Sequence, residues 1–331
     1  KKRLSEKVNN LQKEAREKYK FEGVVGNSPV MMRLLNILME LINSESNVLI
    51  TGESGTGKEL VAHAIHSNSR RSDKPFVVVN CGAVPENLQE SELFGHVMGS
   101  FTGAVKDKNG IFLEAQGGTL FLDEIGETSP STQVKLLRFL QNGEIRKVGD
   151  NKPIYLDIRI IVATNKDLDE ATKNGSFRKD LFYRLNVIRI HLPPLRERKE
   201  DIPLLINYFV NIYANKLRKK PPEISGDAME LLLNYPWPGN VRELENVIER
   251  SVTLVKGYMI TVADLALQTV SPADTMNVMI ETRGIRAALA QEERKTILES
   301  LRRHAGNRKQ VATNLGISTT TLWRKMKEYQ I

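Results

Sequence analysis

Short apolar runs alternate with helical patterns from about Gly23 to Pro194. The runs are rich in β-branched residues and bounded by chain breakers, so they predict strands over residues 47–51, 75–80, 119–123, 157–164 and 187–192. Apolar residues at helical spacing predict helices near 57–67, 86–94, 130–141 and 166–173. Strands that alternate with helices predict an α/β fold, in which helices cover both faces of a parallel sheet.

The strand pattern stops after this region, and residues 200–267 indicate a small helical domain. Its first helix carries an apolar stripe made of Ile202, Leu205, Ile206 and Phe209. Residues 268–282 are a predicted linker, and residues 283–331 are helical again. Residues 1–20 predict one more helix, because a two-heptad apolar seam is formed by Leu4, Val8, Leu11 and Ala15. This helix is short and begins abruptly, so we interpret it as the end of a linker from an upstream domain.

The distribution of charge adds a candidate partner. The chain has a net charge of +8, but residues 21–282 are acidic overall, whereas residues 283–331 carry 11 Lys and Arg against 4 Asp and Glu. A basic tail favours contact with nucleic acid, although a solvated basic face is an equal alternative on charge alone. The single cysteine, Cys81, forms no internal disulfide and fits a reducing cytosol. No apolar run approaches the roughly 20 residues that span a bilayer, so we expect no membrane partner.

The first predicted strand leads into a glycine-rich loop, which predicts a phosphate site. The loop residues are Gly52, Glu53, Ser54, Gly55, Thr56, Gly57, Lys58 and Glu59. Three glycines let successive backbone N–H groups point at phosphate oxygens, and the following helix adds its positive dipole end. Lys58 is placed to reach the β- and γ-phosphates of ATP. The general pattern has Ser or Thr after the lysine, as a magnesium ligand, where this chain has Glu59.

Two carboxylates follow another predicted strand. Asp123 is placed to hold Mg²⁺, directly or through water, and Glu124 to polarise the attacking water. Asn165 ends a further strand and is a candidate sensor of the γ-phosphate. Asn80 ends the strand before Asp123 and is a candidate to hold Glu124 in an inactive position. Taken alone, each asparagine is equally well explained as a turn residue.

Together these residues resemble the AAA+ domain of the sigma-54-dependent transcription activators, the bacterial enhancer-binding proteins. The resemblance runs from about residue 21 to 267 and rests on long stretches, namely residues 53–59, 91–96, 177–185, 194–198 and 237–244. Glu59 after the lysine matches this family's form of the loop. The resemblance implies an AAA+ α/β subdomain over 21–194 and a helical lid over 195–267. It also implies a receiver or ligand-sensing domain upstream of residue 1.

The resemblance also implies roles for single residues. Arg178 and Arg184 would be arginine fingers that reach the γ-phosphate bound by a neighbouring subunit. Arg242 would sense nucleotide from the lid, and Val25 and Gly26 would lie near the adenine. Asn80 would be the switch residue for Glu124. Hydrolysis would then depend on assembly of dimers into a ring, hexameric by analogy with the family.

The signature loop of this family is Gly-Ala-Phe-Thr-Gly-Ala, and this chain is similar. Its residues are Gly99, Ser100, Phe101, Thr102, Gly103 and Ala104. By resemblance, this loop, and Phe101 and Thr102 above all, contacts sigma-54 in a way coupled to the nucleotide state. Ser100 replaces the family's alanine and adds a hydroxyl able to hydrogen-bond the loop backbone. Without the family, an exposed phenylalanine between glycines predicts a generic binding loop.

Residues 305–327 read as helix, turn and helix, and resemble the Fis-type DNA-binding domain that often ends this family. Asn307 and Ser318 are suitable N-caps, and Gly316 suits the turn. We expect the second helix to contact double-stranded DNA through Ser318, Thr319, Thr320, Thr321, Arg324 and Lys325. A basic helical hairpin used for packing is the alternative.

The sequence therefore favours an ATP-driven activator of sigma-54 RNA polymerase. Two other functions remain as alternatives. A replication initiator or loader would share the ATP site and the DNA-binding tail but has no need of the loop at residues 99–104. A passive DNA-binding repressor would have no need of Glu124, Arg178 and Arg184.

Overall fold

The computed structural model describes residues 21, 23–255, 257–265 and 267, together with the single positions 300, 301, 304, 308 and 310. The chain divides into two compact units, Lys1–Leu265 and Ala266–Ile331. The predicted linker helix over 1–20, the linker over 268–282 and the proposed DNA contacts lie outside the described residues. The structure below is that of the first unit.

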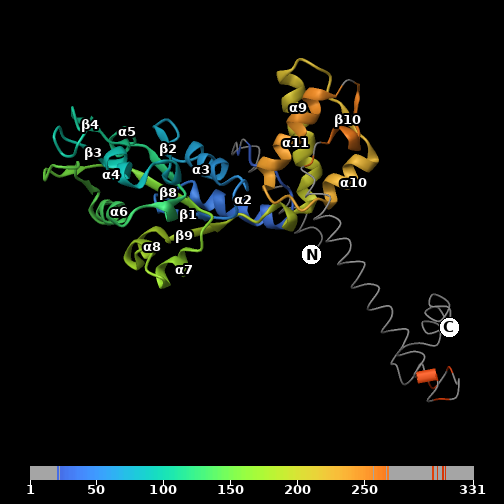
Figure 1. Ribbon diagram of the computed structural model, residues 1–331, viewed down its shortest axis with the longest axis horizontal. Helices are drawn as coiled ribbons and strands as arrows, with labels where there is room; N and C mark the ends of the chain where they lie inside the picture. The colour runs from blue at the N-terminus through green and yellow to red at the C-terminus, as the bar shows by residue number, and fades with distance from the viewer. Residues whose placement is uncertain are drawn as a thin grey trace. The chain divides into compact units, whose positions relative to one another are not determined.

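A five-stranded parallel sheet forms the centre of the α/β region of this unit (Figure 1). Its strands lie in the order β2-β5-β8-β1-β9, so β1 lies between β8 and β9. Their bounds are β1 Val48–Thr51, β2 Phe76–Asn80, β5 Thr119–Asp123, β8 Arg159–Thr164 and β9 Ile188–His191. Each lies within one of the five predicted strands, so the prediction of a parallel α/β sheet is confirmed.

Helices cover both faces of this sheet because its central strands are apolar on both sides. On β1, Val48 and Ile50 belong to a buried cluster with helices α2 and α3, whereas Leu49 points into the cluster on the opposite face. Strand β5 alternates in the same way. The helices are α2 Pro29–Leu41, α3 Lys58–Ser67, α4 Glu86–Phe94, α5 Ile111–Glu114, α6 Pro130–Asn142, α7 Leu168–Lys173 and α8 Lys179–Leu185.

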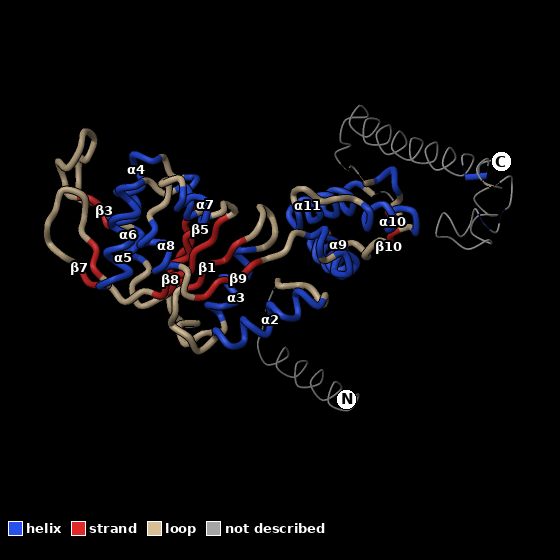
Figure 2. The backbone as a smooth tube through the Cα atoms, turned by 90° about the horizontal axis from the view of Figure 1, so that it is seen from below, coloured by secondary structure: helices blue, strands red, loops and turns tan. Residues whose placement is uncertain are grey.

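Two short antiparallel pairs extend from one end of the α/β region, as both views show (Figures 1 and 2). One pair joins β3 (Gly95–His96) to β4 (Lys108–Asn109), and the other joins β6 (Glu144–Ile145) to β7 (Ile154–Tyr155). A bridge between His96 and Val148 connects the two. The loop at residues 99–104 therefore lies at the tip of a hairpin between α4 and α5.

The described residues of the lid include the helices α9 (Ile202–Lys216), α10 (Gly226–Asn234) and α11 (Asn240–Leu254). The predicted apolar stripe of α9 is confirmed, because all four of its residues are buried. The sequence predicted no strands in residues 200–267, and this prediction was wrong at one point. A short parallel pair joins β10 (Glu223–Ile224) to β11 (Met259–Ile260). Two residues per strand are too few for a period-2 pattern to be recognised. None of the described helices is long and apolar enough to cross a membrane.

Candidate nucleotide site

A cavity of about 330 Å³ opens where the carboxyl ends of β1, β2, β5 and β8 meet the first turn of α11. Ligands bind at this edge in open parallel sheets because successive βα turns converge there. The predicted residues that line the cavity are Ser54, Gly55, Gly57, Lys58, Glu59, Asn80, Asp123, Glu124, Asn165 and Arg242. The cavity thus brings together ten residues spread over nearly 190 positions of sequence. Leu60, Val241 and Glu245 also line it and were not predicted.

The glycine-rich loop has the conformation that a phosphate cradle requires. Gly55 and Gly57 have φ values of 75° and 102°, which glycine adopts far more readily than other residues. Helix α3 begins at Lys58, so its unpaired N–H groups face the cavity. The Lys58 ammonium donates hydrogen bonds to the carbonyls of Gly52 (2.9 Å) and Glu53 (3.0 Å). Burial lowers the pKa of Lys58, and the nearby carboxylates of Asp123 and Glu124 oppose this shift.

Thr56 lies close to Glu59 in sequence but does not replace the missing Ser or Thr. Its hydroxyl donates to the carbonyl of Glu53 (2.8 Å), and its side chain is buried. Gly52 and Glu53 also lie outside the lining of the cavity. Glu59 therefore lines the cavity at the position where the general pattern has Ser or Thr.

Strand β5 places two carboxylates at the cavity. Asp123 ends the strand, and its Oδ1 accepts a hydrogen bond from the backbone N–H of Glu124 (2.9 Å). Glu124 has φ 53° and ψ 45°, a left-handed conformation that costs a non-glycine residue on the order of 1–2 kcal/mol. Such strain occurs often at functional sites, where the surrounding structure holds it in place.

Asn80 stands beside this carboxylate pair, since it is the register partner of Asp123 on the neighbouring strand. In this structure its Oδ1 accepts from the backbone N–H of Ala83 (3.1 Å) and caps the short helix η1 (Cys81–Ala83). Within the described part of the chain, no hydrogen bond joins Asn80 to Glu124. The predicted switch contact therefore stays a prediction, with its two members adjacent but not bonded.

Gly82 gives Glu124 the space it occupies. A Cβ at Gly82 would clash with Oε2 of Glu124 and would lie 3.3 Å from Oδ1 of Asn80. The atom that would have to move is the end of a flexible side chain, so the fold itself is not strained by such a change.

We therefore expect Gly82→Ala to displace the Glu124 carboxylate without unfolding the protein. The kcat for ATP hydrolysis should fall by about tenfold or more, because a misplaced general base loses much of its effect. The KM for ATP and the thermal unfolding midpoint should change little. Steady-state phosphate release and calorimetry measure these quantities. Gly226→Ala is the matched control, because no atom lies within 4 Å of the Cβ it would add.

A second, mostly apolar pocket adjoins the phosphate loop. It is lined by Gly23, Val24, Val25, Met31, Thr56, Gly57, Leu60, Val61, Leu192, Arg198, Leu205 and Val241. Val25 lines this pocket beside the phosphate cradle, and its place near the adenine stays a prediction. Gly26 does not line either pocket, because it packs against Met31 and the carboxylate of Asp201. The buried Arg198, which donates to the Thr56 carbonyl (3.0 Å), was missed.

Comparison with known proteins identifies the family of this chain. Residues 24–191 match the family described as the sigma-54 interaction domain, residues 196–279 match an AAA+ ATPase lid domain, and residues 278–329 match the Fis family of bacterial regulatory proteins. The chain belongs to the sigma-54-dependent transcriptional regulators. It therefore has an AAA+ ATPase domain, its lid and a C-terminal helix-turn-helix domain, as predicted.

Individual relatives support the assignment of this chain to the family. The chain is 48% identical over 304 residues to the transcriptional regulatory protein ZraR of Salmonella typhimurium, covering 92% of this chain and 68% of that protein. It is 45% identical over 332 residues to the regulatory protein AtoC of Escherichia coli, covering 99% and 72%. The crystal structure of NtrX from Brucella abortus with ADP matches with a TM-score of 0.69 and 35% identity, covering 99% and 73%. NtrX has also been crystallised with ATP.

The two arginines assigned as fingers in this sigma-54-dependent regulator lie outside its own nucleotide cavity. Arg178 immediately precedes α8 and forms a two-pronged ion pair with Asp180, with distances of 3.1 Å from Nε and 2.7 Å from Nη2. This pair raises the pKa of Arg178 and lowers that of Asp180. Arg184 is an exposed residue of the same helix. Both guanidinium groups are accessible to a neighbouring molecule.

The loop at residues 99–104 of this regulator rests on its own hairpin. The ring of Phe101 packs edge-on against His96 of β3, with 5.0 Å between the ring centres. His96 Nδ1 is in turn 2.7 Å from the hydroxyl of Ser91 on α4. The residues that flank the loop are exposed, Met98 at 68% and Val105 at 82%, whereas Ala104 within it is buried. A chain of contacts thus connects the loop to α4.

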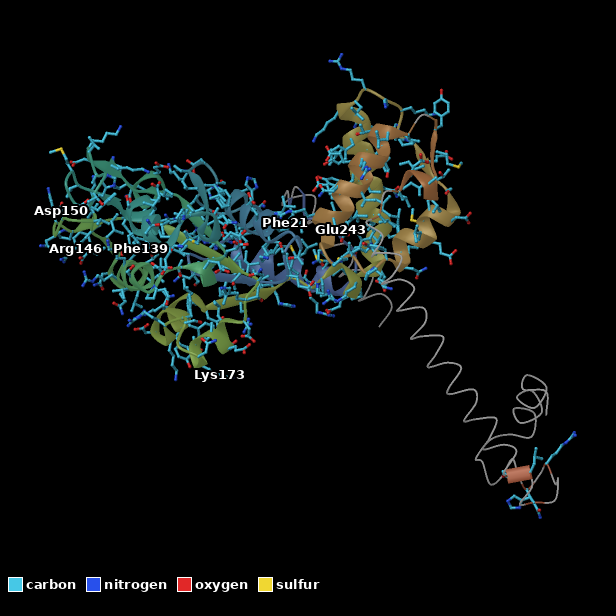
Figure 3. The ribbon with its side chains drawn as sticks, viewed as in Figure 1. Phe21, Phe139, Arg146, Asp150, Lys173 and Glu243 are labelled. Carbon is cyan, nitrogen blue, oxygen red and sulfur yellow. The ribbon has the colours of Figure 1, made fainter. Side chains whose placement is uncertain are left out.

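Ser100 does not form the backbone hydrogen bond that the sequence suggested. Its Cβ packs against Gly149, in the loop between β6 and β7, and its hydroxyl is buried without a partner among the described residues. Figure 3 shows Arg146 and Asp150 of that loop at the hairpin end of the α/β region. An unpaired buried hydroxyl raises the free energy of this arrangement by roughly 1–3 kcal/mol. Alanine at this position would leave no unpaired hydroxyl.

Proposed function

We propose that this chain hydrolyses ATP between the subunits of a ring and uses the energy to remodel sigma-54 RNA polymerase bound at a promoter. The observation that carries the proposal is the division of the catalytic set. Lys58, Glu124 and Arg242 share one cavity, whereas Arg178 and Arg184 are exposed outside it. A complete set then requires a second copy of the chain, which makes hydrolysis depend on assembly.

Within one subunit, the described residues divide the work on ATP. The loop N–H groups and Lys58 bind the phosphates, and the apolar pocket around Val25 takes the adenine. Glu124 accepts the proton of the attacking water. Asn165 and Arg242 line the same cavity, which supports their proposed roles as sensors of the terminal phosphate.

Magnesium fits this donor set. Asp123 supplies a carboxylate at the cavity, and the described residues contain no cluster of three or more metal-ligating side chains. Mg²⁺ is commonly held in this way, by one or two carboxylates together with substrate phosphates and water. When bound, it would neutralise charge that develops on the phosphates.

The hairpin loop is the proposed contact to sigma-54. Gly99 and Gly103 have φ values of 77° and 108°, and no atom lies within 4 Å of a Cβ added at either one. The loop therefore has space to change position, with Phe101 and Thr102 between these two glycines. The C-terminal domain would hold the ring near the promoter by binding upstream DNA through its second helix, for which Arg324 and Lys325 supply positive charge.

We expect Thr102→Ala to lower the capture of sigma-54 by about tenfold while ATP turnover stays within twofold of wild type. The reason is that Thr102 lies in the hairpin loop and is not among the residues that line the cavity. Pull-down of sigma-54 with a transition-state analogue of ATP hydrolysis measures capture, and phosphate release measures turnover. Thr253→Ala on the exposed face of α11 is the matched control.

Other outcomes favour the alternative function. If wild-type protein captures no sigma-54, or if Thr102→Ala captures as much as wild type, the loop is not the contact. A DNA-associated AAA+ loader would then explain the ATP site better than an activator.

A further inference from the structure

Glu53 is the second residue of the phosphate loop, yet its side chain turns away from the nucleotide cavity. Its carboxylate accepts two hydrogen bonds from Arg196, at 2.9 Å from Nη1 and 2.6 Å from Nη2. A third comes from Nδ2 of Asn240, at 3.1 Å. These bonds lower the pKa of Glu53 to about 2, so its carboxylate is ionised at neutral pH. Arg196 belongs to the first segment of the lid, and Asn240 is the first residue of α11.

Asn240 is built into the junction rather than attached to its surface. It is completely buried, and its φ of 55° is one that asparagine tolerates better than most side chains. Its Oδ1 accepts from the backbone N–H of Leu195 (2.8 Å), and its Nδ2 also donates to the carbonyl of Ser54 (3.0 Å). One side chain thus joins the phosphate loop, the start of the lid and the start of α11.

The backbones of the two elements are in direct contact beside it. The N–H of Arg242 donates to the carbonyl of Gly55 (3.2 Å), and a Cβ at Gly55 would clash with the carbonyl of Gly239. Arg242 follows Asn240 by two residues and lines the cavity. Movement of the first turn of α11 relative to the phosphate loop therefore moves Arg242 relative to the phosphates.

We infer that Glu53 is a positioning residue, which clasps the lid to the phosphate loop through Arg196 and Asn240 and so holds Arg242 where it distinguishes ATP from ADP. The carboxylate does not touch the nucleotide. Its two oxygens accept the two parallel N–H groups of the Arg196 guanidinium, and a paired interaction of this kind is strong and directional. The inference rests on the proposed role of Arg242 as the lid-side sensor.

The test compares the dissociation constants of the full chain for a non-hydrolysable ATP analogue and for ADP, measured by calorimetry. Glu53→Gln keeps the shape of the side chain but removes the charge, and we expect the preference for ATP over ADP to fall about fivefold. Arg242→Gln should lower the preference at least as much. In the double variant, Glu53→Gln should have no further effect, because it acts through Arg242.

Asp169→Asn is the matched control. It breaks an ion pair with Arg189 of 3.0 Å whose members are about as exposed as Glu53 and Arg196. It should leave the preference for ATP unchanged, and melting curves verify that each variant is folded.

Each other result has its own meaning. If Arg242→Gln lowers the preference and Glu53→Gln does not, the clasp is overturned while the sensor role stands. Additive effects in the double variant also overturn it, because Glu53 would then act independently of Arg242. If Arg242→Gln leaves the preference unchanged, the proposed sensor role fails first, and the clasp has nothing to position.

Discussion

Replacing Glu124 by Gln should reduce the kcat for ATP hydrolysis by about 100-fold or more, the usual contribution of a positioned general base. The amide keeps the size of the side chain and its place above Gly82 but does not accept the proton of the attacking water. Binding of ATP should persist, because the phosphate loop and the adenine pocket are unchanged. Phosphate release at saturating ATP, together with calorimetric titration of ATP, separates the two effects.

Glu127→Gln provides the control for this substitution. Glu127 lies three residues further along and pairs with Lys166 at the surface, outside the cavity. Its loss should leave kcat within twofold of wild type, since exposed ion pairs contribute about 0–1 kcal/mol to stability. Turnover of Glu124→Gln at the wild-type rate would show that another group activates the water.

The parallel sheet was predictable because its strands are buried on both faces. A run such as Val48–Thr51, buried at every position, reads as continuous apolar sequence between breakers, and the helices between strands have clear periods. Helix α2 was not predicted, although Ser28 and Pro29 at its start are ordinary signals of a helix N-terminus. The two-residue strands β3, β4, β6 and β7 carry no period and depend on tertiary contacts.

The site was predictable wherever a residue ends a strand. Asp123, Asn80 and Asn165 follow apolar runs, and the carboxyl ends of parallel strands meet at one edge. The clasp of Glu53, Arg196 and Asn240 had no such signal. It joins residues up to 187 positions apart and depends on a left-handed backbone at Asn240. The family resemblance marked these stretches without saying which atoms meet.

Arg178→Ala should reduce ATP hydrolysis by about 1000-fold, since an arginine finger stabilises charge that develops on the transferred phosphoryl group. The side chain is now paired with Asp180, outside its own cavity, and must leave this partner to reach a nucleotide. If Arg178 acts on the neighbouring subunit, each site is formed by two subunits, one that supplies Glu124 and one that supplies Arg178. The Glu124→Gln and Arg178→Ala variants then each lack a different one of these two contributions. A mixture of the two inactive proteins should then recover activity.

The size of the recovery follows from the head-to-tail contact. A working interface needs Glu124 from the Arg178→Ala chain and Arg178 from the Glu124→Gln chain. Random assembly of equal amounts gives this combination at about one quarter of interfaces in a ring. A chain that carries both substitutions, mixed with either single variant, should recover nothing, because each such interface lacks one of the two groups. Absence of recovery from the two single variants, in rings shown by co-purification through a tag on one variant to contain both, would place Arg178 in the site of its own subunit, and hydrolysis would no longer require a neighbour.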